Sequence, residues 1–219
     1  MSAAPISPRL LKCGIVVADV ASAALKRVIV LQYNPEMLTR TLQVQTAGGE
    51  GTDRVEPMRL KGPPIETYKL DAVIDATDQL EFPSNNPAAV EAGVSPQLAA
   101  LEALVYPTSA QLQQTDTLAN SGTLEIIPPE APLTLFIWSS RRIVPVRVTE
   151  FSITEEAFDA ALNPIRAKVS LGLRVLSVTD LGFNSKGGSI YMAYHQQKEK
   201  LAAMFRSGEL ANLGIGGIS

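Results

Sequence analysis

The sequence has very little of the side-chain chemistry on which enzymes rely. Its 219 residues include one cysteine, Cys13, and one histidine, His195. Nucleophilic and acid-base catalysis usually combine several such groups. We interpret His195, which lies among polar residues of an expected surface helix, as a solvated or docking residue, and Cys13 as a small buried hydrophobe. The chain is therefore expected not to be an enzyme.

Motifs for metals and cofactors are missing as well. The lone cysteine and histidine lie far apart and have no CxxC or HExxH context, so no metal site is predicted. Glu155 and Glu156 are adjacent, and their side chains would diverge on a strand or on a helix. The glycine-rich run from Gly48 to Gly51 lacks the GK[ST] ending of a phosphate-binding loop. We predict no cofactor.

Charge and long apolar runs are also scarce. Charged residues make up 19% of the chain and the net charge is -3, without the basic excess that nucleic-acid binding needs. The most apolar early stretch is interrupted by Asp19, Lys26 and Arg27, so it is too polar for a membrane-spanning helix. We expect no nucleic-acid partner, no membrane partner and no targeting segment. A single cysteine suits a reducing cytoplasm.

The chain does have enough apolar residues, 46% of the total, to form a sizeable core. Most of its patterned segments alternate apolar and polar residues with the period of two that is typical of strands. The expected strands include 14–20, 27–31, 65–76, 122–127, 133–138 and 144–153. The fold is predicted to be mainly β.

One helix is predicted beside these strands. Ser95 and Pro96 supply an N-cap and a first-turn proline, and leucines follow at helical spacing up to Val105. Pro107 ends the pattern. This helix is expected to pack on a sheet or to close one end of a barrel.

The strand that begins near Val144 changes the face that it would bury. Its apolar residues first fall at even positions, through Val148, and then at odd positions, from Phe151 onward. A regular pleat would turn one of these sets away from the core. The pattern therefore predicts a β-bulge or bend near Thr149 and Glu150.

The clearest alternation runs from Asn163 to Ser177. Apolar residues from Ile165 to Val175 alternate with a polar face that carries Arg166, Lys168 and Arg174. We expect this strand to lie in the centre of a sheet. Its basic face could line a channel, contact an acidic neighbour, or simply be solvated.

The composition changes near residue 185, where a hinge of small residues precedes a second expected helix, Ser189 to about Phe205. We therefore divide the chain into a β-domain, 1–184, and a C-terminal helix with a flexible tail, 185–219. One helix face carries an apolar stripe: Ile190, Tyr194, Leu201, Met204 and Phe205. This stripe should dock on the β-domain or on a neighbouring chain.

Two stretches resemble a known family. A strand rich in valine and isoleucine ends at Tyr33-Asn34-Pro35, and the alternating strand is entered through 163–167, Asn-Pro-Ile-Arg-Ala. In this order they resemble contractile injection system tube-type proteins over residues 10 to 180. The chain is most similar to the tube-to-spike adaptor subunits related to LysM-bearing phage baseplate proteins. It shows no LysM domain, so peptidoglycan binding is not expected.

The resemblance implies a tail-tube-like barrel of two packed antiparallel sheets, with a flanking helix and a C-terminal helical tail. It also implies a ring, expected to be hexameric, whose partners are the inner-tube protein, the trimeric spike protein and other baseplate components. Assembly would occur in the bacterial cytoplasm, and the ring would initiate the tube. The expected interface residues are Arg166, Lys168, Arg174, Tyr194, Leu201 and Phe205. The alternatives are an ordinary inner-tube subunit and, from another class, a small-molecule-binding β-barrel.

Overall fold

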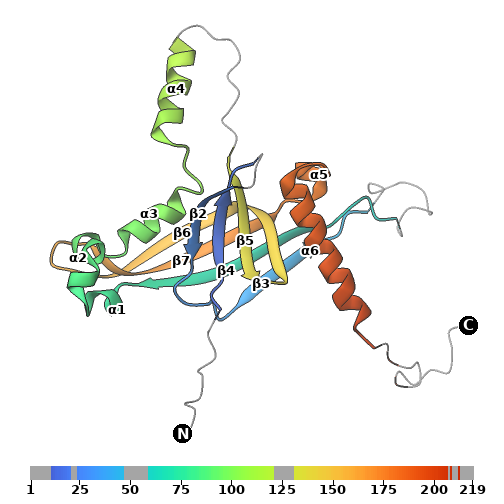
Figure 1. The fold of residues 1–219 in the computed structure, drawn as a ribbon, viewed down its shortest axis with the longest axis horizontal. Coiled ribbons are helices and arrows are strands. Elements are labelled where there is room, and N and C mark those ends of the chain that lie inside the picture. The colour runs from blue at the N-terminus through green and yellow to red at the C-terminus, as the bar shows by residue number, and fades with distance from the viewer. Residues whose placement is uncertain are drawn as a thin grey trace, which may run out of the picture.

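A computed structural model describes residues 11–20, 24–46, 59–120, 131–206, 208 and 212 (Figure 1). Its strands form one antiparallel sheet in the order β2-β1-β5-β6-β7-β4-β3. The strands are β1 Gly14–Ala18, β2 Leu25–Val30, β3 Leu38–Gln43, β4 Ile65–Asp75, β5 Leu133–Ser139, β6 Arg142–Phe158 and β7 Pro164–Val175. The helices are α1 Thr77–Leu80, the 3-10 helix η1 Pro83–Asn85, α2 Pro87–Ala92, α3 Ser95–Glu102, α4 Ser109–Asn120, α5 Val178–Leu181 and α6 Lys186–Ala203. The prediction of a mainly β fold is confirmed.

Strand β6 joins the two halves of this sheet. Its first residues, up to Val146, pair with β5, whereas the stretch from Val146 to Phe158 pairs with β7. In Figure 1, strands β2, β1 and β5 cross in front of the long strands β4, β6 and β7. The rings of Tyr68 from β4 and Phe136 from β5 lie 5.7 Å apart between the two halves. One continuous sheet therefore bends over its own core.

The bend coincides with the parity change in the sequence. The pairing register of β6 with β7 shifts between Val148 and Glu150, so Thr149 is the extra residue of a bulge. Because a bulge increases local twist and turns the strand, both apolar sets of β6 can face the core. The predicted bulge near Thr149 and Glu150 is confirmed.

The prediction of two packed sheets that close as a barrel is not confirmed. Among the described residues the strands belong to a single sheet, and the sheet is open because its end strands β2 and β3 do not pair with each other. The physical reason is the length of β6, 17 residues, which lets one strand serve both halves. The two faces that the sequence suggested are thus two halves of one bent sheet.

Strand β7 is central, as expected. It pairs with β6 on one side and with β4 on the other. Val169 and Leu173 are fully buried in the main core. Helix α3 covers this core with Leu98 and Leu101, which confirms the predicted flanking helix.

The two asparagine-proline segments of the resemblance are turns held by their own side chains. The Asn34 side chain accepts a hydrogen bond from the Cys13 amide and donates one to the Leu11 carbonyl. The Asn163 side chain donates to the Glu91 carbonyl and to Asp159. Except for the local bond to Asp159, these bonds join segments that are far apart in the sequence, so both motifs have a structural role within the chain.

Gly93, which ends α2 and lies against the Asn163-Pro164 turn, supports the first testable prediction. Its φ is +57°, and a Cβ atom built there would lie 2.1 Å from the Pro164 carbonyl oxygen. We expect Gly93→Ala to lower the free energy of unfolding by about 3 kcal/mol, because left-handed strain adds to a backbone clash. Urea unfolding measures the change. Gly62→Ala is the matched control, since a Cβ there would meet nothing within 4 Å. Equal stability of the two variants would contradict the strain and the clash expected at position 93.

Some predictions fall elsewhere. The glycine-rich run from Gly48 to Gly51, the strand predicted at 122–127 and most of the tail beyond Gly208 lie outside the described residues. Helix α4, in contrast, was not expected from the sequence. Its twelve residues include no buried side chain, and Figure 1 shows it projecting from the body.

Candidate assembly surfaces

The two end strands of the sheet are the first candidate surface. Among the described residues, neither β2 nor β3 has a strand partner on its outer side. Unpaired edges present backbone donors and acceptors that invite another strand. Strand β2 adds apolar side chains that face solvent: Val28 is 55% exposed and Val30 is 56% exposed. This edge has the chemistry of a contact surface.

Val28 and Val30 also belong to an apolar surface on the outer face of the sheet. Val28 pairs with Val16 and Val30 pairs with Gly14, and both partners pair in turn with apolar residues of β5. Val16 itself is buried, within a smaller outer cluster that includes Leu133 and Leu135. The exposed side chains of β2 therefore continue a covered apolar surface out to the edge.

The predicted basic face lies on the outside of β7, where acidic side chains neutralise it. Arg166 lies 3.5 Å from Glu156, and Lys168 lies 2.9 Å from Asp71. Arg174 is likewise 2.9 Å from Asp180. Hydrogen bonds from Ser170 and Lys168 hold the pKa of Asp71 below its ordinary value. The face is thus a set of ion pairs, of which the Arg174–Asp180 pair is partly buried, and its role in an interface stays a prediction.

Tyr194, another predicted interface residue, is buried within its own chain. Its hydroxyl and that of Tyr68 each donate to Glu66 Oε1 over 2.7 Å, and the two hydroxyls are themselves 2.7 Å apart. The Lys198 ammonium lies 2.7 Å from Glu66 Oε2 and 4.2 Å from the centre of the Tyr194 ring. Arg40 Nε is 3.9 Å from Glu66 Oε1. We call Glu66, Tyr68, Tyr194 and Lys198 the buried polar cluster.

Glu66, Tyr68 and Tyr194 of the buried polar cluster have shifted pKa values. Burial alone would raise the pKa of Glu66, but hydrogen bonds from Lys198, Tyr194 and Tyr68 outweigh it, and the net pKa is lowered. Burial is also the main reason that the pKa of Tyr194 is raised. At neutral pH the cluster thus holds a carboxylate and two neutral phenols beside the Lys198 side chain, an arrangement that anchors α6 to β4.

Sequence reasoning missed this cluster, although a signal was present. Glu66 has the same parity as Tyr68 and Leu70, so a strand places all three side chains on one face of β4. It is only 3% exposed. A carboxylate on the buried face of a strand requires a partner, and that requirement could have pointed to the C-terminal helix.

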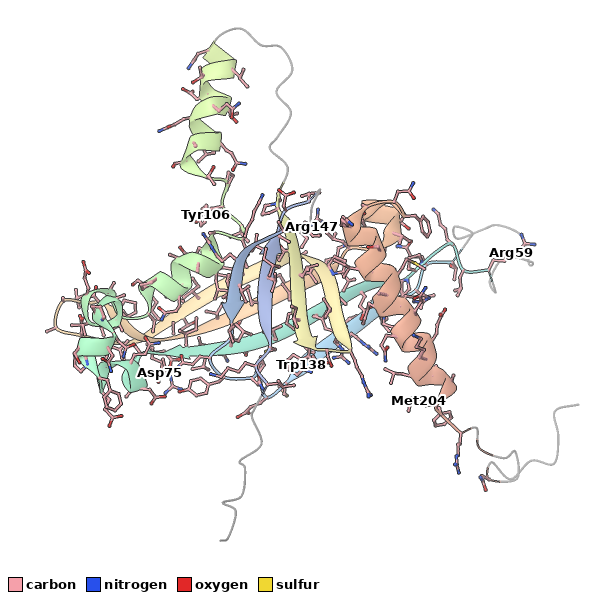
Figure 2. All side chains as sticks on the ribbon, viewed as in Figure 1. Arg59, Asp75, Tyr106, Trp138, Arg147 and Met204 are labelled. Atoms are coloured by element: carbon pink, nitrogen blue, oxygen red, sulfur yellow. The ribbon has the colours of Figure 1, made fainter. Side chains whose placement is uncertain are left out.

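Helix α6 divides the predicted apolar stripe into two parts. Of the stripe's first residues, Tyr194 is buried, and Ile190 packs against the cluster of Val16, Leu133 and Leu135. At its end, Leu201 is 42% exposed and Phe205 is 79% exposed, and Met204 is exposed as well. In Figure 2 the labelled Met204 lies at the far end of the helix, away from the sheet. The first half of the stripe docks on its own β-domain, which is one of the two expected outcomes. The second half faces solvent.

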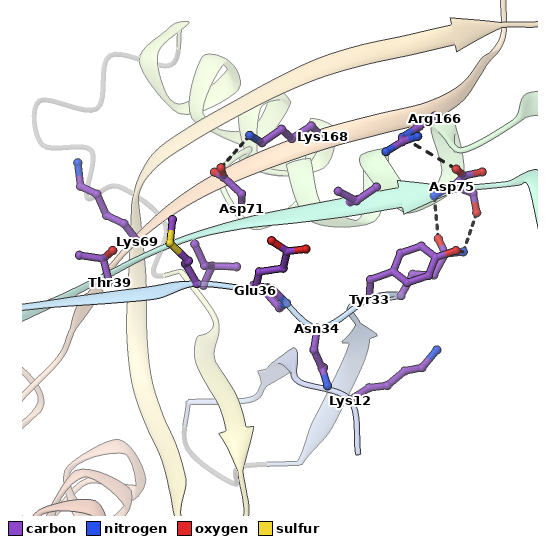
Figure 3. A pocket seen from close by; sticks show the side chains of 15 residues that line it. Lys12, Tyr33, Asn34, Glu36, Thr39, Lys69, Asp71, Asp75, Arg166 and Lys168 are labelled. Atoms are coloured by element: carbon purple, nitrogen blue, oxygen red, sulfur yellow. Dashed lines mark hydrogen bonds and ion pairs between the residues drawn. The ribbon is translucent and has the colours of Figure 1, made fainter. Parts of the chain in front are cut away.

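An open groove of about 1240 Å³ lies beside the Tyr33-Asn34-Pro35 turn (Figure 3). Its other wall is the outer face of β4 and β7, with Asp71, Asp75 and Lys168. The Gln32 amide closes one end by bonding both the carbonyl and the amide of Asp75, at 2.7 and 2.8 Å. The groove is charged with both signs and open to solvent, so it has no features of an enclosed ligand cavity.

Comparisons with known proteins add little. No family model matches the chain, and no curated protein matches it. One solved structure that it resembles is the "tail of empty GTA particle computed with helical refinement, C6 symmetry". The identity is 11%, the TM-score is 0.28, and the match covers 75% of this chain and 90% of that chain. A likeness this loose assigns neither fold nor function.

Two further searches of the described residues were negative. No group of three histidine, cysteine, aspartate or glutamate side chains there could hold a metal ion. No helix in that part of the chain is both long and apolar enough to span a membrane.

Proposed function

We propose that this chain is a non-enzymatic structural subunit that forms a ring in a phage-tail-like contractile injection particle. In that particle it would connect the central spike to the inner tube and initiate tube assembly. The observation that carries the proposal is the open sheet, whose two end strands have no partner among the described residues. A subunit with two free edges can join a neighbour at each edge, and the repeated contact closes a ring.

The exposed residues of β2 support this role. Val28 and Val30 are apolar side chains on an edge strand, an arrangement that soluble monomers usually avoid because it promotes strand pairing between chains. The two motifs of the sequence resemblance add support, since the first lies in the turn from β2 to β3 that connects the halves of the sheet, and the second in the turn from β6 to β7. The adaptor position rests on that resemblance.

Blocking the β2 edge tests ring formation. We expect Val28→Lys combined with Val30→Lys to convert the ring to monomers in native mass spectrometry, because two ammonium groups cannot be buried between strands. Folding should be retained, since both side chains are more than half exposed. Thr117→Lys on exposed α4 is the control. A wild-type chain that is monomeric both alone and with the other particle proteins would refute the proposal.

The ordinary inner-tube subunit is the alternative within the same class. It uses the same free edges but would be present in many rings per particle, whereas an adaptor forms one. Quantitative mass spectrometry of purified particles, counted against the main tube protein, separates the two. One ring per particle supports the adaptor, and many rings support the tube subunit.

A further inference from the structure

The two ends of the molecule's long axis carry exposed surfaces of opposite character (Figure 1). The first, which we call the α6 end, consists of Leu201, Met204 and Phe205 with Lys200 and Arg206. All five residues are exposed. No ion pair within the described residues involves Lys200 or Arg206, and the acidic neighbour Glu199 lies 3.5 Å from His195. The α6 end is therefore apolar with a basic border.

The second surface lies where α1 and α2 meet the turn between β6 and β7, and we call it the hairpin end. Its exposed apolar residues are Phe82, Val90, Phe158 and Leu162. The Asn163 side chain donates to the Glu91 carbonyl, and the Val94 amide donates to the Pro164 carbonyl, so the helices and the turn form one unit. Phe82 is 57% exposed and Leu162 is 78% exposed.

Acidic residues surround the hairpin end. The exposed acidic residues are Asp78 on α1, Glu81 just after it, Glu91 on α2 and Glu155 on β6. Among the described residues none of these four carboxylates forms an ion pair; the nearby Arg166 instead contacts Asp75 and Glu156. The hairpin end is therefore apolar with an acidic border, the electrostatic complement of the α6 end.

We propose that the α6 end of one copy binds the hairpin end of a second copy, head to tail. The two surfaces lie on opposite sides of the folded molecule, so they cannot meet within one copy (Figure 1). Each joins an apolar centre to a charged rim of the sign that the other needs, as in specific interfaces. A contact between two different surfaces repeats from copy to copy and closes a ring when the rotation permits. The inference rests on the proposed ring but uses surfaces separate from the strand edges.

Disulfide trapping tests the contact directly. Leu162→Cys and Phe205→Cys are made in separate preparations, which are mixed under mild oxidation. Cys13 is buried and is common to both preparations. The mixture should give a covalent dimer that neither variant gives alone. A mixture that links no more than each variant alone would overturn the inference. So would trapping of the Phe205→Cys variant on another particle protein, which would make that protein the occupant.

Charge reversal tests the electrostatic part. Lys200→Glu with Arg206→Glu should weaken self-association about tenfold, and so should Glu81→Lys with Glu91→Lys. Mixing the two reversed chains should restore association, because the borders are again opposite in sign. Lys61→Glu, an exposed residue that belongs to neither surface, is the control. Reversed chains that assemble like wild type, without a gain on mixing, would contradict the proposal.

The outcomes distinguish this contact from the ring itself. If rings form but no disulfide is trapped and charge reversal does not change self-association, the proposed function stands and the head-to-tail contact is rejected. Trapping that survives in the Val28→Lys, Val30→Lys variant supports the contact independently of the edges. A chain that neither assembles nor traps fails both proposals.

Discussion

Replacing Val169 with aspartate should leave little folded protein. Val169 is fully buried, and its strand β7 is paired on both sides, to Ala72 on β4 and to Ile153 on β6. A carboxylate there would have no partner and no water, and such a substitution costs about 5 kcal/mol or more, comparable to the whole stability of many domains. Soluble yield and circular dichroism measure the result.

The same substitution on the outer face of the sheet is the control. Thr154 is exposed on β6 and lies directly opposite Lys168, so Thr154→Asp adds a carboxylate beside an ammonium. We expect its free energy of unfolding to stay within about 0.5 kcal/mol of wild type. A Val169→Asp protein with wild-type solubility and spectrum would show that β7 is not central.

Removing the carboxylate of the buried polar cluster should release helix α6. Glu66→Ala leaves two hydroxyls and the Lys198 ammonium without their shared acceptor. Breaking a fully buried pair costs about 3 to 5 kcal/mol, and we expect about 2 kcal/mol here because Lys198 is partly exposed to solvent. Urea unfolding gives the loss, and hydrogen exchange should show faster exchange confined to α6. Glu199→Ala on the same helix is the control.

The cluster also predicts a pH dependence. The pKa of Glu66 in the folded chain is lower than in the unfolded chain, so its stabilising effect is complete above about pH 4.3, the ordinary glutamate value. It is lost as the pH falls through the folded-state pKa. The stability difference between wild type and Glu66→Gln should therefore shrink on acidification from pH 6 towards about pH 3. If the stability difference between wild type and Glu66→Gln stays constant over that pH range, the ionised carboxylate of Glu66 does not cause it.

Several parts of the fold could be predicted because they depend on neighbouring residues. The alternation of β7, the start of α3 at Ser95 and the helix that follows Ser185 are local patterns, and the structure has an element at each place. The parity change in β6 could also be located, since a pleat allows only one side-chain period. In each case the signal and the structure lie within about twenty residues.

Contacts between distant segments could not be predicted in the same way. The sequence does not indicate that β1 lies between β2 and β5, or that β3 ends the sheet beside β4. Nor does it indicate that Asp71 neutralises Lys168. These outcomes depend on which strands pair, and many pairings bury a similar apolar area. The expected barrel failed for this reason, because one long bent strand joined two faces that the sequence suggested as separate sheets.

The sequence by itself determined the strand periods, the bulge in β6 and the near absence of catalytic side chains, since these follow from composition and from the local backbone. Only the tertiary structure decided that, within the described residues, the sheet stays open at two edges, that the basic face of β7 is neutralised, and that Glu66 anchors α6. It also decided which half of the α6 stripe remains exposed. Each of these depends on the packing of residues from distant parts of the chain, and local periodicity carries no record of that packing.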